Sequence, residues 1–434
     1  WATLWDFAGI VGERGRRTAE DLDRMPGTRW FPDAELNFAE NLLQRRDETP
    51  ALVYRDETGL RASVSFAELA ARVASVAAHL AESGLVPGSR VVGIGPNRIE
   101  TVVAMLATTQ LGGVWSSCSP DFGTAAIVDR FAQIEPTTLI GCQGYFHGGK
   151  WFDCAARLAD VAKRLPSVTK TIVIRTADSP PNLGGLPNAC TFESLLDHAA
   201  PRRDYVRLPF AAPLYILFSS GTTGAPKCIV HSIGGTLLQH RKEHLLHCDL
   251  RASERLLFYT TCGWMMWNWL ISALAGGATV CLYDGSPFSP DPGVLPRYVD
   301  DEAVNHLGIS PGFLSALAKQ NYRPNAQHGL SSLRSILSTG APLPGESFAW
   351  AYNNIARVRV SSITGGTDII GCFALGNPTL PVYAGEIQAA GLGMAVAFYS
   401  DDGTPLATEK GELVCTRSFP SMPIGFWNDE GGAR

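Results

Sequence analysis

A short polar stretch between two apolar runs holds the densest group of chemically useful side chains in the sequence. Four hydroxyl side chains, two glycines and one lysine occur within nine residues: Ser219, Ser220, Gly221, Thr222, Thr223, Gly224 and Lys227. Glycines let successive backbone N–H groups turn toward one ligand, hydroxyls add donors without bulk, and the lysine supplies a positive charge. The stretch therefore predicts a loop that binds a polyphosphate.

The spacing of this loop differs from that of a Walker A motif, which needs G-x-x-x-x-G-K-[ST] at the start of a helix. Here Cys228 follows the lysine, and Pro226 and the β-branched Ile229 and Val230 favour a strand. A P-loop kinase or NTPase is therefore disfavoured. The remaining alternative is a Ser/Gly surface turn between two hairpin strands, but this density of hydroxyls beside a fixed lysine is uncommon in such turns.

The segment 219–227 closely resembles the phosphate loop of the adenylate-forming superfamily, which includes acyl-CoA synthetases, peptide-synthetase adenylation domains and luciferases. Three further segments resemble motifs of that superfamily in the same order along the chain. Residues 340–342 resemble its adenine-contacting turn, 363–368 its Gly-Thr-acid segment, and 411–414 a strand of its β-barrel part. The resemblance extends over nearly the whole chain.

Two more runs, 30–43 and 421–427, resemble the acetyl-CoA synthetase branch, and most closely its members that act on acetoacetate. The resemblance implies a ligase that uses ATP and Mg²⁺, with CoA as a substrate. Acetoacetate would attack ATP to give an acyl-adenylate and pyrophosphate, and CoA would then displace AMP. Two alternatives are another short- or medium-chain acyl-CoA synthetase and a nucleotide-binding fragment without turnover.

The resemblance also implies roles for individual residues. The catalytic set is Lys227, Thr367 and His231, of which Lys227 would hold the β- and γ-phosphates together with the loop 219–224. Thr367 would contact the α-phosphate, and His231 would lie near the substrate carboxylate; the alternative for His231 is a structural histidine. Adenine would lie against two segments: Gly340, Ala341, Pro342, Ser362, Ile363 and Thr364.

Asp368 stands where the superfamily usually has a glutamate associated with Mg²⁺. A carboxylate suits this hard cation. Because aspartate is one methylene shorter, a bridging water could replace direct ligation, and a structural cap at the end of a strand is the alternative.

The resemblance places the acyl pocket at Trp264, Met265, Thr339 and Gly365. Gly365 stands where the acetyl-CoA synthetase branch has a tryptophan, so we expect a wider pocket. A hydroxyl at Thr339 could face a polar atom of the substrate, which favours a short β-keto acid. For the aromatic cluster 264–269 the alternative is an ordinary hydrophobic core.

Helical and strand patterns that alternate along the chain must position these residues. We expect helices at 66–83, 100–111, 124–134 and 151–165, and strands at 90–94, 113–116, 138–141, 170–174, 391–399 and 411–416. The fold class is α/β: two β/α subdomains with mainly parallel sheets packed together, plus a small β-barrel. The expected division is 1–210 with an N-terminal extension, 211–383 with the nucleotide site, and 384–434 as the β-barrel part.

Composition excludes several classes of protein. The chain has 434 residues, 45% of them hydrophobic and 18% charged, and a net charge of −5. These values argue against disorder, and no basic run suggests a nucleic-acid partner. Ten cysteines without metal-binding spacing indicate reduced thiols and a cytoplasmic protein.

Residues 264–283 form an uncharged stretch long enough to nominate a membrane helix. The pair Gly276-Gly277 instead predicts a helix, a turn and then a buried strand, so no membrane partner is expected. Members of the superfamily carry a mobile C-terminal domain with a catalytic lysine, and nothing after 425–427 resembles it. We therefore expect that domain to be absent from this sequence.

Overall fold

Two large sheets organise the chain in the computed structural model, which describes residues 1–219 and 226–429. The eight-stranded sheet has parallel pairing from β12 to β14, and antiparallel pairing of β15 with β14 and β27. Its strands are, in spatial order, β12 (Cys190–Thr191), β11 (Lys170–Ile174), β8 (Thr138–Cys142), β6 (Arg90–Ile94), β7 (Val114–Cys118), β14 (Pro213–Phe218), β15 (Cys228–Ser232) and β27 (Gly425–Phe426).

The seven-stranded sheet is parallel except for its last strand, β5. Its strands are, in spatial order, β20 (Arg359–Ser362), β19 (Ser335–Ser338), β18 (His306–Ile309), β16 (Arg255–Phe258), β17 (Thr279–Asp284), β4 (Pro50–Asp56) and β5 (Arg61–Ser65). The prediction of mainly parallel sheets is confirmed.

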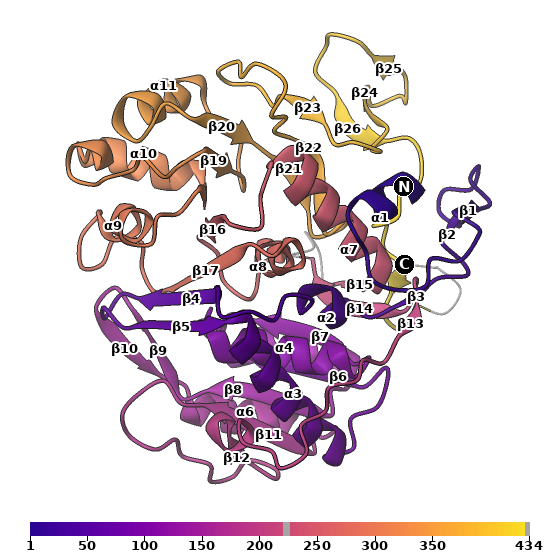
Figure 1. The fold of residues 1–434 in the computed structure, drawn as a ribbon, viewed down its shortest axis with the longest axis vertical. Coiled ribbons are helices and arrows are strands. Elements are labelled where there is room, and N and C mark those ends of the chain that lie inside the picture. Colours follow the sequence, from indigo (N-terminus) through magenta and orange to yellow (C-terminus); the bar gives the residue numbers. More distant parts are fainter. Residues whose placement is uncertain (220–225, 430–434) are drawn as a thin grey trace.

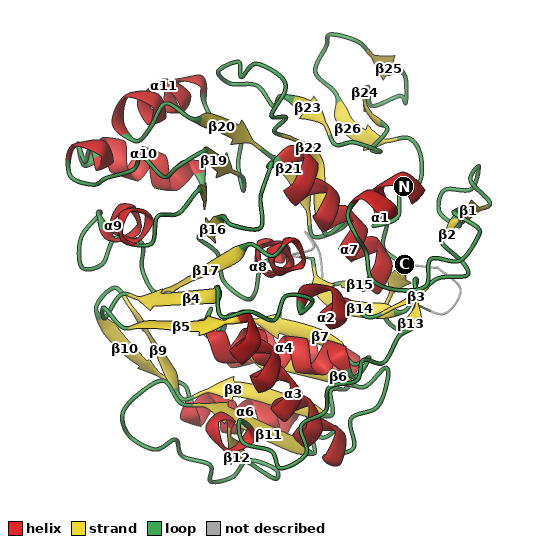
Figure 2. Cartoon of the chain, in the orientation of Figure 1, coloured by secondary structure: helices red, strands yellow, loops and turns green. Residues whose placement is uncertain are grey.

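Helices lie outside and between the two sheets (Figures 1 and 2). One apolar core joins both sheets through the central helices α2 (Phe38–Leu42), α3 (Phe66–Glu82), α4 (Ile99–Gln110), α7 (Ile233–Lys242) and α8 (Met265–Ile271). A second core packs α9 (Val294–Asp301), α10 (Pro311–Lys319) and α11 (Gly345–Asn354) on the outer face of the seven-stranded sheet. A third packs α5 (Thr124–Phe131) and α6 (Ala155–Arg164) on the outer face of the eight-stranded sheet.

Strand β16 contributes side chains to two different apolar cores. Leu256 and Phe258 belong to the central core, whereas Leu257 between them belongs to the outer core. Successive side chains of a strand point to opposite faces, so a sheet covered on both faces needs a continuous apolar run. The expected strands at 90–94, 138–141 and 170–174 have this composition and are present as β6, β8 and β11.

The two sheets exchange strands across the expected boundary near residue 210. β4 and β5 come from the first 65 residues but belong to the seven-stranded sheet, whereas β14 and β15 complete the eight-stranded one. The division 1–210, 211–383 and 384–434 therefore does not follow sheet membership. Apolar runs of similar composition do not specify which parallel neighbour each strand takes.

The C-terminal segment has strands without helices, as predicted. In the described residues β27 joins the eight-stranded sheet, and the other C-terminal strands belong to two small three-stranded sheets, the first of which also takes two strands from before residue 384; they do not form a closed barrel. The first contains β21 (Thr364–Gly366), β22 (Gly371–Leu375) and β23 (Ala389–Ala390); the second contains β25 (Pro405–Leu406), β24 (Val396–Tyr399) and β26 (Glu412–Cys415).

The helix expected at 151–165 is wrong in its first residues. Lys150–Asp153 is strand β10, which pairs with β9 (Gly144–His147), and α6 begins only at Ala155. Gly148 and Gly149 between these strands have φ of 62° and 75°, as a tight hairpin turn requires. This Gly-Gly pair was the missed signal.

The remaining elements are short. They are α1 (Ala2–Phe7), the pair β1 (Ala19–Glu20) and β2 (Arg29–Trp30), the pair β3 (Glu35–Leu36) and β13 (Leu208–Pro209), and the single turns η1 (Ala132–Ile134), η2 (Phe192–Leu195), η3 (Glu243–His247), η4 (Ser272–Gly276) and η5 (Pro324–Ala326).

α8, η4 and β17 confirm the helix, turn and strand expected at 264–283. Within 1–219 and 226–429 no helix is long and apolar enough to span a membrane. All ten cysteines are free, which confirms the expected thiols.

Candidate functional site

The hairpin β14–β15 carries the two ends of the expected phosphate loop. Phe218 pairs with Cys228, and the backbone N–H of Ser219 donates to the carbonyl of Lys227 at 3.2 Å. Lys227 is exposed, and its Nζ lies 5.4 Å from the centre of the Phe426 ring in β27. The other expected phosphate ligands, Ser220, Gly221, Thr222, Thr223 and Gly224, lie outside the described residues. The two strands that flank this segment, and the place of Lys227 directly before β15, agree with the sequence prediction.

His231 lies further along β15, opposite Tyr215, and is 1% exposed. Neither of its ring nitrogens makes a hydrogen bond of normal geometry within the described part of the chain. Burial lowers the pKa of His231 to about 3, although the nearby backbone of Thr367 partly opposes this shift. The structure thus brings two of the three expected catalytic residues together, with the imidazole held neutral at physiological pH.

Thr367 and Asp368 lie in the turn that joins β21 to β22. The turn ends at Ile370, whose φ of 47° is unusual for a β-branched residue. The Asp368 side chain is exposed, and a Cβ on Gly366 would collide with its carboxylate. Glycine at 366 therefore gives the carboxylate room to fold back over the turn.

The two segments expected to bind adenine converge at the carboxyl edge of the seven-stranded sheet. Ser338 pairs with Ser362 in neighbouring parallel strands, and the N–H of Ile363 donates to the carbonyl of Ser338 at 2.9 Å. The hydroxyl of Thr339 donates to the carbonyl of Ile363 at 3.0 Å. Beyond it, residues 340–342 are exposed. The carboxyl edge of a parallel sheet is the usual place for ligands in α/β proteins.

The residues expected to line the acyl pocket differ in their exposure to solvent. Trp264 precedes α8 and is 64% exposed, whereas Met265 is buried. Trp267 and Trp269 belong to the central core, where their indole N–H groups donate to Asn97 Oδ1 at 3.0 Å and Glu243 Oε2 at 2.8 Å. The core interpretation of the aromatic cluster is therefore correct for Trp267 and Trp269.

Gly365 requires a correction. A Cβ at this position would collide with the carbonyl of Gly371 and lie 2.7 Å from the Cα of Cys372. The direction a side chain would take is thus filled by strand β22 and is not open cavity. Close approach of two backbones explains this glycine, and the argument that a lost indole widens the pocket here fails.

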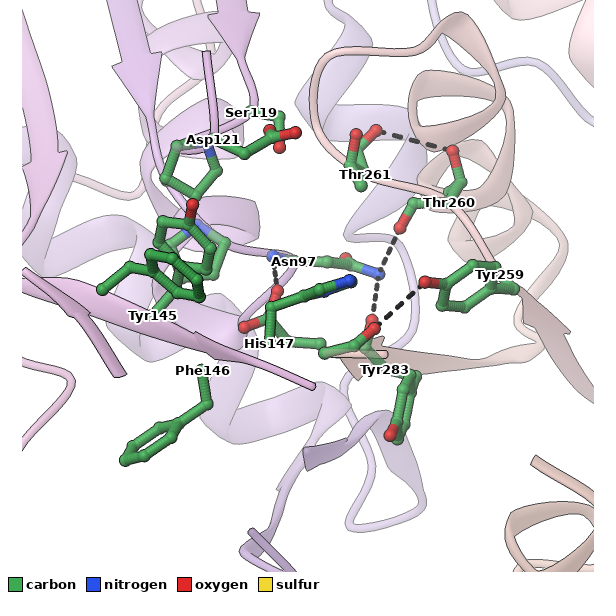
Figure 3. Close-up of a pocket in the computed structure, with 16 residues that line it drawn as sticks. Asn97, Ser119, Asp121, Tyr145, Phe146, His147, Tyr259, Thr260, Thr261 and Tyr283 are labelled. Carbon is green, nitrogen blue, oxygen red and sulfur yellow. Dashed lines mark hydrogen bonds between the residues drawn. The ribbon is translucent and has the colours of Figure 1, made fainter. Parts of the chain in front are cut away.

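A cavity of about 150 Å³ that the sequence analysis did not identify lies where both sheets meet (Figure 3). It is lined from the carboxyl ends of β6, β7, β16 and β17 and from the hairpin β9–β10. Asn97 follows β6, and its side-chain amide donates across the junction to the carbonyls of Tyr283, at 3.3 Å, and Thr260, at 3.5 Å. Burial raises the pKa of the lining Asp284 to about 7, opposed by the N–H of Asn97 and the charge of Arg98.

One cluster elsewhere has the composition of a metal site. His79, Glu82 and His198 offer ligand atoms within 4.8 Å of one another. However, the N–H of Ala200 donates to Nδ1 of His198, which leaves the proton on Nε2, and Nε2 lies 3.0 Å from Glu82 Oε1. A protonated nitrogen cannot ligate a cation, so we assign this cluster to a hydrogen bond that ties the loop after η2 to α3.

Comparisons with known proteins agree with this geometry. The family model described as "AMP-binding enzyme" matches residues 38–422. The acetoacetyl-coenzyme A synthetase of Rhizobium meliloti is 50% identical over 439 residues, a match that covers 100% of this chain and 67% of the relative. The acetoacetyl-CoA synthetase of Gallus gallus is 44% identical, with the same coverage. The solved structure of the acetoacetyl-CoA synthetase from Streptomyces lividans superposes with a TM-score of 0.94 at 42% identity, covering 100% of this chain and 68% of that one. The chain thus spans about two thirds of the length of these relatives.

Proposed function

This chain belongs to the AMP-binding enzyme family, and from that premise we propose that it is part of an acetoacetyl-CoA synthetase. The single observation that carries the proposal is the 50% identity to such a synthetase along the whole chain. The first half-reaction would join acetoacetate to AMP and release pyrophosphate. The second would form the thioester with CoA and release AMP.

In the first step a carboxylate oxygen of acetoacetate attacks the α-phosphorus of ATP, and the bond to the β,γ-pyrophosphate breaks. Both reactants are anions, so the protein must neutralise charge and align the reacting atoms. Lys227, exposed at the end of the loop, would oppose the charge on the leaving pyrophosphate. Thr367 would donate to the α-phosphate from the turn beside His231.

Asp368 fits a role in holding Mg²⁺. Mg²⁺ in nucleotide sites is usually bound by one or two carboxylates together with substrate phosphates and water. The Asp368 carboxylate is exposed at the turn, so it can face such a cation directly or through water. When bound, the cation would reduce the negative charge of the phosphates.

His231 is the better of the two candidates for recognising the acyl group. Neither ring nitrogen meets the criteria for a hydrogen bond in the described chain, although the backbone of Thr367 lies close enough to one of them to raise the pKa of the ring. The Thr339 hydroxyl, by contrast, already donates its only proton to the carbonyl of Ile363. We propose that His231 donates to an oxygen of acetoacetate, and that Thr339 shapes the site without donating.

The competing proposal is a synthetase for another short- or medium-chain acid. The test uses the full-length protein with acetate, butyrate, 3-hydroxybutyrate and acetoacetate at equal concentrations, ATP, Mg²⁺ and CoA. Thioester and AMP are measured for each acid. We expect the highest kcat/KM for acetoacetate; a higher value for butyrate would favour the competing proposal. We further propose a cytoplasmic location, which the ten free cysteines support.

A further inference from the structure

A group of fully buried polar side chains lies behind the Thr367–Asp368 turn and has no part in the chemistry above. α7 follows β15 directly and continues into η3, a π-helical turn. Gln239, His240 and Glu243 on these elements each have 0% exposure. Burying such groups is unfavourable unless they are hydrogen-bonded, so their partners identify what they hold.

His240 holds the last residue of the turn. Its Nε2 lies 2.6 Å from the carbonyl of Ile370, and because a carbonyl only accepts, Nε2 must carry the proton. Burial lowers the pKa of His240 to about 4, so the ring is neutral and Nδ1 accepts from the hydroxyl of Ser272 at 2.7 Å. Both ring nitrogens are paired, which fixes the orientation of the ring.

Glu243 holds the next part of the backbone. Its Oε1 accepts from the N–H of Cys372 at 2.8 Å and from the Gln239 amide at 2.6 Å, while Oε2 accepts from Trp269. A Cβ added to Gly371 would lie 2.7 Å from Gln239 Cγ and 3.0 Å from Glu243 Oε1. The backbone at 371–372 is therefore pressed directly against these side chains.

Between these two contacts the chain has a conformation that it does not prefer. Ile370 has a φ of 47°, in the left-handed region that is costly for a β-branched residue. Such a residue persists only where its surroundings determine the backbone. The bonds from His240 and Glu243 to residues 370 and 372 supply that determination immediately after Thr367 and Asp368.

We propose that His240 and Glu243 are positioning residues that hold the Thr367–Asp368 turn in its ligand-binding geometry. The same helix begins at Ile233, two residues after His231, so α7 connects the strand that follows the expected phosphate loop to the turn. The assignment of ligands to the turn rests on the proposed function, whereas the bonds that hold the turn do not.

Two substitutions of His240 separate positioning from general stability. In His240→Asn the amide can replace Nδ1 toward Ser272 but cannot reach the carbonyl of Ile370. In His240→Gln the longer side chain can restore a donor near the Nε2 position. His244→Asn is the matched control, because His244 is also buried on η3 and packs on Trp269, and its ring makes no hydrogen bond to residues 367–372 in the described chain.

The first readout is amide hydrogen exchange of the full-length protein, followed on peptides that cover residues 365–375. Loss of one buried hydrogen bond should raise local exchange about tenfold in His240→Asn. His240→Gln should exchange more slowly than His240→Asn, and His244→Asn should match the wild type in this segment. Equal exchange in His240→Asn and His244→Asn would overturn the proposal.

The second readout is acid-dependent exchange of pyrophosphate with ATP. A misaligned turn should lower kcat about tenfold and raise the Mg²⁺ concentration needed for half-maximal rate, while KM for acetoacetate changes little. If His240→Asn does not fold, Gly371→Ala disturbs the same contact from the turn side and should show the same pattern; wild-type behaviour of Gly371→Ala would then overturn the proposal. If the wild type shows no exchange with any acid, the proposed function fails, and the hydrogen-exchange result still decides the positioning.

Discussion

Replacing Lys227 by alanine should impair adenylation far more than thioester formation. Two unit charges about 4 Å apart interact by roughly 1 kcal/mol in water and roughly 4 kcal/mol at an effective dielectric constant near 20. Lys227 is exposed, and bound ATP would exclude part of the water around it. We therefore expect a loss of about 10- to 1000-fold in pyrophosphate exchange. Stability should fall by less than about 1 kcal/mol, because the lysine side chain lies over the exposed edge of the fold, against the Phe426 ring, where a cation–π contact contributes little.

The assay compares two starting points in the full-length protein. One supplies ATP and acetoacetate, and the other supplies synthetic acetoacetyl-adenylate with CoA. Pyrophosphate has left before CoA attacks, so Lys227→Ala should be slow only from ATP. Lys319→Ala, an exposed lysine at the end of α10 on the outer face, is the control and should be normal in both assays. An equal loss from both starting points would refute the assignment.

Three further predictions concern the fold and the substrate. Gly365→Ala should destabilise the protein strongly, by more than about 2 kcal/mol, because its Cβ meets the carbonyl of Gly371, whereas Gly123→Ala, with open space around its Cβ, should unfold like the wild type in urea. Asp284→Asn should stabilise the protein increasingly as the pH rises from about 4 to about 7: the native pKa is raised to about 7 from 3.8, so the wild type loses stability across that window. The full shift corresponds to about 4 kcal/mol, which solvent in the adjoining cavity reduces to about 1–2 kcal/mol; urea unfolding at about pH 5 and about pH 8 measures the difference, and a larger gain at the lower pH would contradict it. Acetoacetate should be preferred to butyrate in kcat/KM by more than the roughly 10- to 200-fold that one methylene provides, because butyrate leaves a buried donor unpaired; equal values would mean that the site reads length alone.

Much of the fold could be predicted from the sequence, because many of its strands and helices have local sequence patterns typical of these elements. The apolar run 91–94 predicts a buried strand, and Ser65 with Glu68 forms the capping box that starts α3. The exchange of strands between the two sheets could not be predicted from the sequence, because the pairing of β4 with β17 joins segments more than 200 residues apart. Such pairing depends on the packing of the whole molecule.

Site residues could be predicted where a motif consists of contiguous residues, as in the hairpin that carries Lys227. The site could not be predicted where the identity of a residue depends on a contact with a residue distant in the sequence. Gly365 is small because of β22, a constraint that no local pattern contains. Likewise, the sequence Arg241-Lys242-Glu243-His244 has the composition of a solvated helix face, yet all four side chains are buried. Only the structure shows that this segment supports the turn.

The central claim, that a carboxylate of acetoacetate attacks the α-phosphorus of ATP, is tested most directly by isotope transfer. Full-length protein is incubated with acetoacetate labelled with ¹⁸O in its carboxylate, ATP, Mg²⁺ and CoA, and the nucleotide product is analysed by mass spectrometry. We expect AMP that carries one ¹⁸O in its phosphate, since the oxygen that formed the adenylate leaves with AMP. Unlabelled AMP, or ADP together with labelled inorganic phosphate, would contradict it.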